Sequence, residues 1–412
     1  MIAFSHVGTS DIGNYGDLLY PIVLSRLLER CGVPASVRRV SLLGGTAPLD
    51  AGFTSIPLRR LFERGAEPGL VVVGGGDLLR VDADVVAGHY RTLARRDRRE
   101  LRRVLGCFGA LRHVVRRNVS RRPAQADFVA RFRARAMRYP APGPFLLDPG
   151  DLPRGSSTFY LSVGVPHELD GPERPRGARA LDRARFLWVR DRPSHDKLRR
   201  AGVTGTIHVE PDLVVLLGDV FARDVEARRG RALLAAHDVD VARPIVCFQC
   251  QSASDDEDEI VARLRRHQDV AGAEIVLLPL GPCHGDDAFA RRLAARAGGR
   301  FRDVGVLPVL DMLAVIAASD VFVGTSLHGS VTAFSFGIPH LLAPQEVDKS
   351  SGFLEIVGAP REHRLASWRE LDDRLAWAAG QDRRRMAERA ADAKARVRRA
   401  VDGLLAALQG ER

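Results

Sequence analysis

A histidine follows an apolar, strand-like run in SDVFVGTSLHGSVTAFSFGIPHLL, residues 319–342. The β-branched run ends at Gly324, and a short helical pattern begins soon after it. A helix start carries unpaired backbone N–H groups and about half a positive charge, so it favours an anion. The pattern therefore predicts an anion-binding corner beside His328. The alternative is that Thr325 or Ser326 only caps the helix and that His328 is a surface histidine.

Two glycine-rich corners follow apolar runs in the first half of the chain, in SHVGTSDIGNYGD and in GLVVVGGGDLL. Their candidate binding and catalytic residues are Asn14, Gly16, Asp17, Gly74, Gly75, Gly76 and Asp77. Glycine lets backbone N–H groups approach a ligand without a Cβ clash, and the polar side chains can fix the loop or contact substrate hydroxyls. Loop building and close helix packing are the alternatives. The first corner does not match GxGxxG, so it is weak support for a dinucleotide site.

Polar residues follow several other predicted strands. They are Arg190, Asp212, His284, Asp287, Glu346 and Lys349. Because open parallel sheets bind ligands outside the carboxyl ends of their strands, we expect these side chains to line the same edge as His328. Each of them, taken singly, fits a surface position equally well. Ser194, which follows Arg190 by four residues, is predicted to cap the next helix.

The apolar runs that would carry these residues recur along the chain, with helical segments between them. They cover residues 2–7, 37–42, 70–73, 158–163 and 186–189, and then 245–248, 274–280, 320–323 and 340–342. Such alternation is typical of parallel βα units. The sequence therefore predicts an α/β fold of two Rossmann-like domains that face a cleft.

We expect an N-terminal domain at residues 1–220 and a C-terminal domain at residues 240–365. An arginine-rich helical insertion of about residues 85–145 would extend from the first domain. Residues 366–412 would form a helical segment whose apolar face packs across both halves. That face consists of Val397, Val401, Leu404 and Leu408.

The net charge of +11 suggests an anionic partner, but the excess is local. Between Arg91 and Arg138, sixteen arginines stand against three acidic residues, a balance of +13. Three interpretations remain open: a solvated insertion, a surface for a polyanionic acceptor or for peripheral contact with anionic lipid headgroups, and a nucleic-acid site. Nucleic acid ranks last because the segment has few aromatic residues to stack bases.

Five cysteines in 412 residues are too few for a disulfide framework and fit a reducing compartment. Cys247 and Cys250 form a CxxC without a second pair, so core cysteines are favoured over zinc, and no metal site is predicted. The start has no charged region followed by an apolar core, and no run approaches the roughly 18 apolar residues of a membrane span. These features predict a cytoplasmic protein.

Taken in order, these corners resemble the polysaccharide pyruvyl transferase family. The matching elements are NYGD, VVVGGGDLL, FLWVRDRPSHDKLRRAGV, VEPDLVVLL, LLPLGPCHGDD and GTSLHGSVTAFSFGIP. The resemblance implies a GT-B-like arrangement. It also implies an enzyme that moves a pyruvyl group from phosphoenolpyruvate onto sugar hydroxyls as a ketal, in polysaccharide or glycoconjugate biosynthesis. Family members often show Ser-Arg-Leu-His-Gly, and here Ser326 stands at the arginine position.

The resemblance also implies roles for individual residues, with the acceptor on the N-terminal side and the donor on the C-terminal side. His328 would be the acid, and Asp17, Asp77 and His284 are alternative bases toward the acceptor. Groups that would hold the donor are Arg190, Ser326, Glu346, Lys349 and the backbone N–H groups of Gly329 and Ser330. Neither a metal nor a cofactor is required, since phosphoenolpyruvate is a co-substrate. The acceptor would be a sugar or glycoconjugate, lipid-linked sugars included.

Two other functions remain open. The same fold would serve a glycosyltransferase that uses a nucleotide-diphospho-sugar, with Glu346 near the ribose hydroxyls. The other is a family member that binds its ligand without catalysis.

Overall fold

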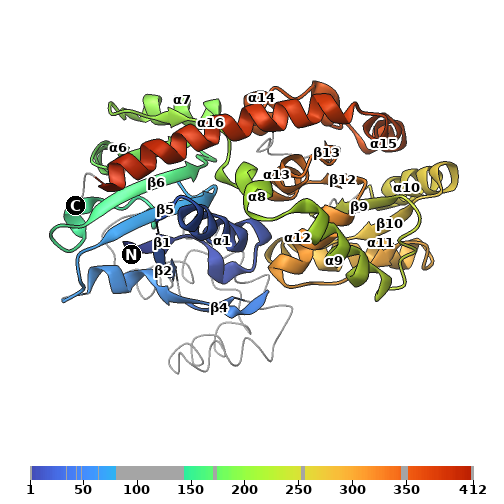
Figure 1. The fold of residues 1–412 in the computed structure, drawn as a ribbon, viewed down its shortest axis with the longest axis horizontal. Coiled ribbons are helices and arrows are strands. Elements are labelled where there is room, and N and C mark those ends of the chain that lie inside the picture. The colour runs from blue at the N-terminus through green and yellow to red at the C-terminus, as the bar shows by residue number, and fades with distance from the viewer. Residues whose placement is uncertain are drawn as a thin grey trace, which may run out of the picture.

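The computed structural model describes most of the chain (Figure 1). The described residues are 2–33, 35–42, 44–47, 49–63, 65–79, 143–169, 174–251, 256–344 and 351–409. Glu346, Lys349 and nearly all of the insertion predicted at residues 85–145 lie outside them.

The first half contains an eight-stranded sheet in the order β3-β4-β2-β1-β5-β6-β7-β8. Its strands are β1 (Ile2–Val7), β2 (Ala35–Ser41), β3 (Gly45–Ala47), β4 (Asp50–Pro57), β5 (Leu70–Gly76), β6 (Ser157–Val163), β7 (Phe186–Val189) and β8 (His208–Val209). Neighbouring strands are parallel except β3, which pairs antiparallel with β4. The helices of this half include α1 (Tyr15–Arg30), α6 (Arg174–Asp182) and α7 (Arg192–Ala201). Strands β5 and β6 are buried along almost their whole length, as is typical of parallel sheets covered by helices.

The second half contains a five-stranded parallel sheet in the order β11-β10-β9-β12-β13. Its strands are β9 (Ile245–Gln249), β10 (Glu274–Leu277), β11 (Arg302–Asp303), β12 (Val321–Gly324) and β13 (His340–Leu342). Its helices include α10 (Glu257–Ala271), α11 (Asp286–Arg296), α12 (Val309–Ala318) and α13 (Leu327–Ser335). Both sheets therefore consist of strand–helix units, as the apolar runs predict.

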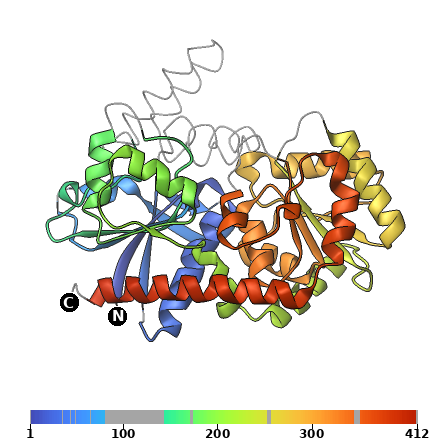
Figure 2. The same cartoon turned by 90° about the horizontal axis from the view of Figure 1, so that it is seen from above.

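A connection and a long helix join the two halves. The connecting elements are η5 (Leu213–Leu216), α8 (Leu217–Val220) and α9 (Arg223–Ala235), and the C-terminal ones are α14 (Ser351–Ile356), α15 (Leu371–Ala379) and α16 (Arg383–Gln409). Figure 2 shows that α16 runs past both sheets. Arg396 of α16 donates from Nε to Glu210 of the first half and from Nη1 to the carbonyl of Ile356, each at 2.8 Å. The predicted packing of this helix across both halves is confirmed.

One apolar core continues through both halves. It includes Leu18 of α1, Met312 of α12 and Val397 of α16. Helix α1 also contacts α13, where the hydroxyls of Tyr15 and Thr332 lie 3.0 Å apart. Domains connected by a polar interface move by default, whereas a large apolar interface holds them together. We therefore expect the two halves to behave as one body.

Two buried histidines make the stability of this fold sensitive to acid. Burial lowers the pKa of His6 to about 4 and that of His340 to about 3. An unperturbed histidine titrates near 6.5, so at pH values between these limits the unfolded chain binds more protons than the folded chain. The free energy of unfolding should therefore fall as the pH decreases below 6.5, by about 2 kcal/mol per histidine between pH 6.5 and 5.

Urea denaturation at a series of pH values checks this prediction. The variant His340→Gln should lose one of these proton-linked contributions, so its stability should depend less steeply on pH than that of the parent protein. Equal slopes for the two proteins would contradict the assignment.

Candidate functional site

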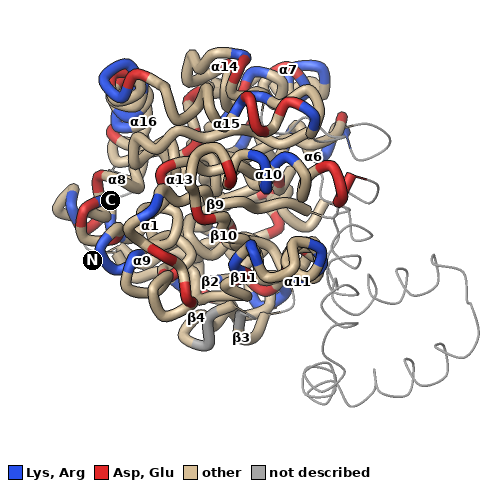
Figure 3. Tube along the Cα trace, turned by 90° about the vertical axis from the view of Figure 1, so that its right-hand side faces the viewer, with Lys and Arg blue, Asp and Glu red and all other residues tan. Residues whose placement is uncertain are grey.

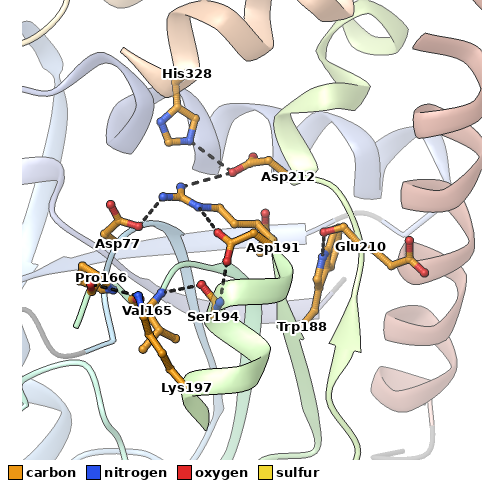
Figure 4. Close-up of polar contacts among 12 residues, drawn as sticks. Asp77, Val165, Pro166, Trp188, Asp191, Ser194, Lys197, Glu210, Asp212 and His328 are labelled. Carbon is orange, nitrogen blue, oxygen red and sulfur yellow. Dashed lines mark hydrogen bonds and ion pairs between the residues drawn. The ribbon is translucent and has the colours of Figure 1, made fainter. Parts of the chain in front are cut away.

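Charged side chains from both halves meet where β5, β7 and β8 end and α13 begins (Figure 4). Asp77 follows β5, Asp212 lies three residues beyond β8, and Arg190 and Asp191 directly follow β7. His328 is the second residue of α13. The structure thus brings together residues that are far apart in the sequence, at the carboxyl ends of strands, where ligands of parallel sheets bind.

Three carboxylates surround the guanidinium of Arg190, which is only 5% exposed. Nη2 donates a hydrogen bond to Asp77 Oδ1, Nη1 lies 3.6 Å from Asp212 Oδ2, and Nε lies 3.9 Å from Asp191 Oδ2. Burial alone would lower the pKa of Arg190, but Asp77, Asp212 and Asp191 raise it above its usual value. The cation predicted to hold the donor is therefore already paired with protein carboxylates. In this arrangement the first role of the Arg190 guanidinium is to hold the three carboxylates in place.

His328 lies between two groups of the first half. Its Nε2 is 3.6 Å from Asp212 Oδ2, and its side chain is 7% exposed. On another side the ring contacts the first turn of α1, because a Cβ built on Gly16 would lie 2.0 Å from His328 Nδ1. Glycine in NYGD therefore has a physical reason, since any larger residue would occupy the position of the imidazole.

The variant Gly16→Ala should displace this imidazole. A misplacement of about 1 Å can cost about a hundredfold in rate, and overpacking costs about 1–3 kcal/mol in stability. We expect a loss of turnover of up to about a hundredfold and a smaller loss of affinity for the donor. Gly69→Ala is the matched control, because a Cβ there meets nothing within 4 Å. Parent-like turnover in Gly16→Ala would contradict the contact.

Asp17 is a buried carboxyl group close to the same ring. Burial raises its pKa to about 6, although Thr9, His328, Arg190 and Asn14 lower it in part. Thr9 Oγ1 donates to Asp17 Oδ2 at 2.6 Å. A carboxyl group that titrates this close to neutral pH can both accept and release a proton, which is the property of a general base.

The three glycines that end β5 lie against α1. A Cβ on Gly74 or Gly75 would lie 2.6 and 2.8 Å from the side chain of Tyr20, and Gly75 and Gly76 have φ values of +82° and +114°. A Cβ on Gly76 would come within 2.9 Å of Asp17 Oδ1. Close helix packing, one of the two readings of this corner, therefore explains Gly74 and Gly75, and Gly76 makes room for the Asp17 carboxyl.

The start of α13 corrects one prediction. Ser326 caps the helix, since its Oγ accepts from Gly329 N at 3.2 Å and its carbonyl accepts from Ser330 N at 3.1 Å. The two amides expected to hold the donor phosphate are thus bonded within the protein. Gly329 is instead needed for packing, because a Cβ there would lie 2.4 Å from the ring of Phe322.

A buried network fixes this corner against the neighbouring strands. Gln249, at the end of β9, accepts from Ser326 N at 2.8 Å and donates to Asp286 Oδ2 at 2.7 Å. The same Asp286 oxygen accepts from the amides of Leu280 and Gly281. The network holds the His328 corner to the loop after β10 and so supports the geometry of the site.

The family model for polysaccharide pyruvyl transferase matches residues 14–343, which begin at NYGD in the first corner and extend past the His328 corner. The chain belongs to the polysaccharide pyruvyl transferase family. No match was found among curated proteins.

Solved structures that share this fold include three UDP-GlcNAc 2-epimerases, one of them putative. A UDP-GlcNAc 2-epimerase from Methanocaldococcus jannaschii has a TM-score of 0.51 at 10% identity, with 93% of this chain and 94% of that chain covered. The enzyme from Neisseria meningitidis, bound to UDP-GlcNAc, has a TM-score of 0.50 at 10% identity, with both chains fully covered. A putative enzyme of the same kind from Listeria monocytogenes has a TM-score of 0.50 at 12% identity, covering 99% of this chain and 96% of that one. The predicted fold of two Rossmann-like domains in a GT-B arrangement is confirmed.

Several contacts of this pyruvyl transferase family member differ from the sequence-based expectations. Asp191, rather than Ser194, caps α7, since its Oδ1 accepts from Ser194 N at 2.7 Å. The local sequence Asp-Arg-Pro carries the signal, because Asp at the cap and Pro in the first turn are a typical helix start.

His284 lies in η6 (Pro282–His284) beside Gly281, and Asp287 pairs with Arg291 of its own helix at 3.1 Å. Gln249 was not among the predicted residues, although its position as a polar residue at the end of an apolar strand could have indicated it.

Helices α10, α11 and α15 each carry both acidic and basic residues (Figure 3), and pairs such as Arg263 with Glu259 at 2.8 Å neutralise one another. Within the described ranges, no helix is long and apolar enough to cross a membrane.

Among the same residues, no group of three or more His, Cys, Asp and Glu is arranged to hold a metal ion. Cys247 and Cys250 are buried free thiols, as expected of core cysteines.

Proposed function

We propose that the protein transfers a pyruvyl group from phosphoenolpyruvate onto two hydroxyls of a sugar, which form a ketal with release of phosphate. The family match supports this assignment. The observation that carries it is the position of His328, which contacts Gly16 and faces Asp212 at 3.6 Å, next to a carboxyl group that titrates near pH 6.

The reaction needs an acid, a base and stabilisation of positive charge. His328 would protonate C3 of the enol, and a cation would then develop at C2 as the sugar oxygen attacks. The carboxylates around Arg190 would favour that cation electrostatically. Asp17 would take the proton of the sugar hydroxyl, and it is preferred over Asp77, which is bonded to Arg190. Above pH 6 the Asp17 carboxylate is available as a base.

The anionic donor needs cations beyond this cluster, since three carboxylates already face Arg190. Lys349 stays a prediction for that role because it lies outside the described residues. The acceptor would be a sugar or glycoconjugate, and contact with lipid headgroups through residues 85–145 stays a prediction in the same way.

The second candidate is a glycosyltransferase that uses a nucleotide-diphospho-sugar. Two observations favour it: the fold shared with UDP-GlcNAc 2-epimerases, and Ser326 at the position where family members often carry arginine. A protein that binds its ligand without catalysis is the third.

Calorimetry with phosphoenolpyruvate and with UDP-GlcNAc, followed by phosphate-release assays with a panel of sugar acceptors, separates the three. Pyruvyl transfer predicts binding of phosphoenolpyruvate and acceptor-dependent release of phosphate. Binding of UDP-GlcNAc alone would replace the proposal by the second candidate. Binding of phosphoenolpyruvate without turnover over the whole panel would favour the third.

A further inference from the structure

We propose that Asp212 is the positioning residue of this site, which holds the His328 imidazole of the second half and the Arg190 guanidinium of the first half with one carboxylate oxygen. This role was not assigned from the sequence, where Asp212 is only one of several strand-end residues. The kinetic part of the proposal rests on the proposed function, whereas the part that concerns the ring does not.

The backbone fixes the Asp212 side chain rigidly. The residue is 1% exposed, and its Oδ1 accepts from Val214 N at 3.0 Å. The next amide, that of Leu213, donates to Ser162 Oγ at 3.0 Å, and Ser162 has a φ of +58°, which is rare for a residue other than glycine. Because one oxygen is held by the chain, the other has a defined direction.

That second oxygen, Oδ2, faces two nitrogen atoms at equal distances. Arg190 Nη1 and His328 Nε2 both lie 3.6 Å from it. All three atoms are buried and have no hydrogen bond to the described residues. Hydrogen bonds of this kind measure about 2.7–3.2 Å. A small movement of the ring would therefore bring His328 Nε2 within hydrogen-bonding distance of Asp212 Oδ2, and a ligand atom that entered here could bond to these groups as well.

The charged groups that face His328 come from the first half. Asp212 lies at its Nε2, Asp17 lies in the first turn of α1 next to Gly16, and Arg190 lies beyond Asp212. Burial raises the pKa of Asp212, but His328, Arg190 and the amide of Val214 outweigh it and bring the pKa below its usual value. The carboxylate is therefore ionised at neutral pH, and it stabilises the protonated imidazole that a general acid needs.

The variant Asp212→Asn tests this role, because it removes the charge and retains an oxygen that can accept from Val214 N. Asp191→Asn is the matched control. Asp191 also caps a helix with one oxygen and faces Arg190 with the other, but its side-chain oxygens face Ser194 and Arg190, not His328. The two variants therefore alter the same guanidinium, and only the first alters the ring directly.

The first measurement is NMR of protein labelled with nitrogen-15 in histidine, with the His328 signal identified by its loss in His328→Gln. In Asp212→Asn the nitrogen-15 signals of the ring should shift, because Nε2 loses the carboxylate that faces it at 3.6 Å. In Asp191→Asn the same signals should shift by less than half as much. Asp212→Ser retains a capping oxygen and should reproduce the shift if the asparagine variant does not fold.

The second measurement is the pH profile of pyruvyl transfer. In Asp212→Asn, kcat should fall by at least about tenfold, and the alkaline limb of the kcat/KM profile should move to lower pH, while KM for phosphoenolpyruvate changes little. A ring shift of equal size in both variants, or none in either, would overturn the proposal. If the His328 signals shift only in Asp212→Asn but the parent protein has no pyruvyl transfer activity, the positioning role stands and the proposed function is rejected.

Discussion

Replacing His328 by alanine is expected to lower turnover at least about a hundredfold while donor affinity changes little. The reason is that the ring is held by Gly16 and Asp212 rather than by a described contact with a phosphate-binding group, so its removal takes away the acid but not the binding site. Single-turnover rates and calorimetry with phosphoenolpyruvate measure the two quantities separately.

The control for this prediction is His237→Ala, which removes an exposed histidine from a turn far from α13 in the sequence. It should leave both quantities as in the parent protein. An unchanged rate in His328→Ala would remove the imidazole from the chemistry and favour Asp17 as the proton carrier.

Replacing Arg190 by methionine is expected to have the largest effect on stability. The substitution retains most of the volume but leaves Asp77, Asp191 and Asp212 without their common cation in a buried place. Breaking a buried ion pair by removing one partner costs about 3–5 kcal/mol. Urea denaturation at pH 7 should show a loss of this size.

Two further variants make this prediction specific. In the double variant Arg190→Met with Asp212→Asn, one uncompensated charge is gone, so part of the lost stability should return. Arg200→Met removes an arginine that pairs with Glu168 at 2.7 Å on the surface, and its effect should be much smaller. Equal losses in Arg190→Met and Arg200→Met would show that the buried cluster does not hold the fold.

Most of the sheet framework could be predicted from apolar runs. The predicted strands at residues 2–7, 186–189 and 340–342 agree with β1, β7 and β13 in their bounds. Strand β3 at the edge of the first sheet and its neighbour β4 were missed because they contain glycine and polar residues, and β8 and β11 were missed because they have two residues each. Short strands owe their extended form to pairing with neighbours, so their own residues carry little signal.

Several residues of the described cluster could be predicted from the sequence, but Asp191 and the contacts within the cluster could not. The strand-end rule and the glycine corners indicated Arg190, Asp212, Asp17 and His328, since each follows an apolar run or a helix start. The sequence does not contain the distances that bring three carboxylates to one guanidinium. It also left open whether Ser326 would cap α13 through the amide of Gly329, since a capping serine and a phosphate compete for the same group.

Helix α16 has a consequence for the order in which the protein is made. Phe186 of β7 belongs to the same core as Val397 and Leu404, and a Cβ on Gly403 would lie 3.5 Å from the Phe186 ring. A ribosome adds about 5–20 residues per second, so roughly 10–40 s would pass between the synthesis of Phe186 and the synthesis of the segment that covers it. Nascent chains stalled before α16 should therefore bind chaperones through this edge of the first sheet.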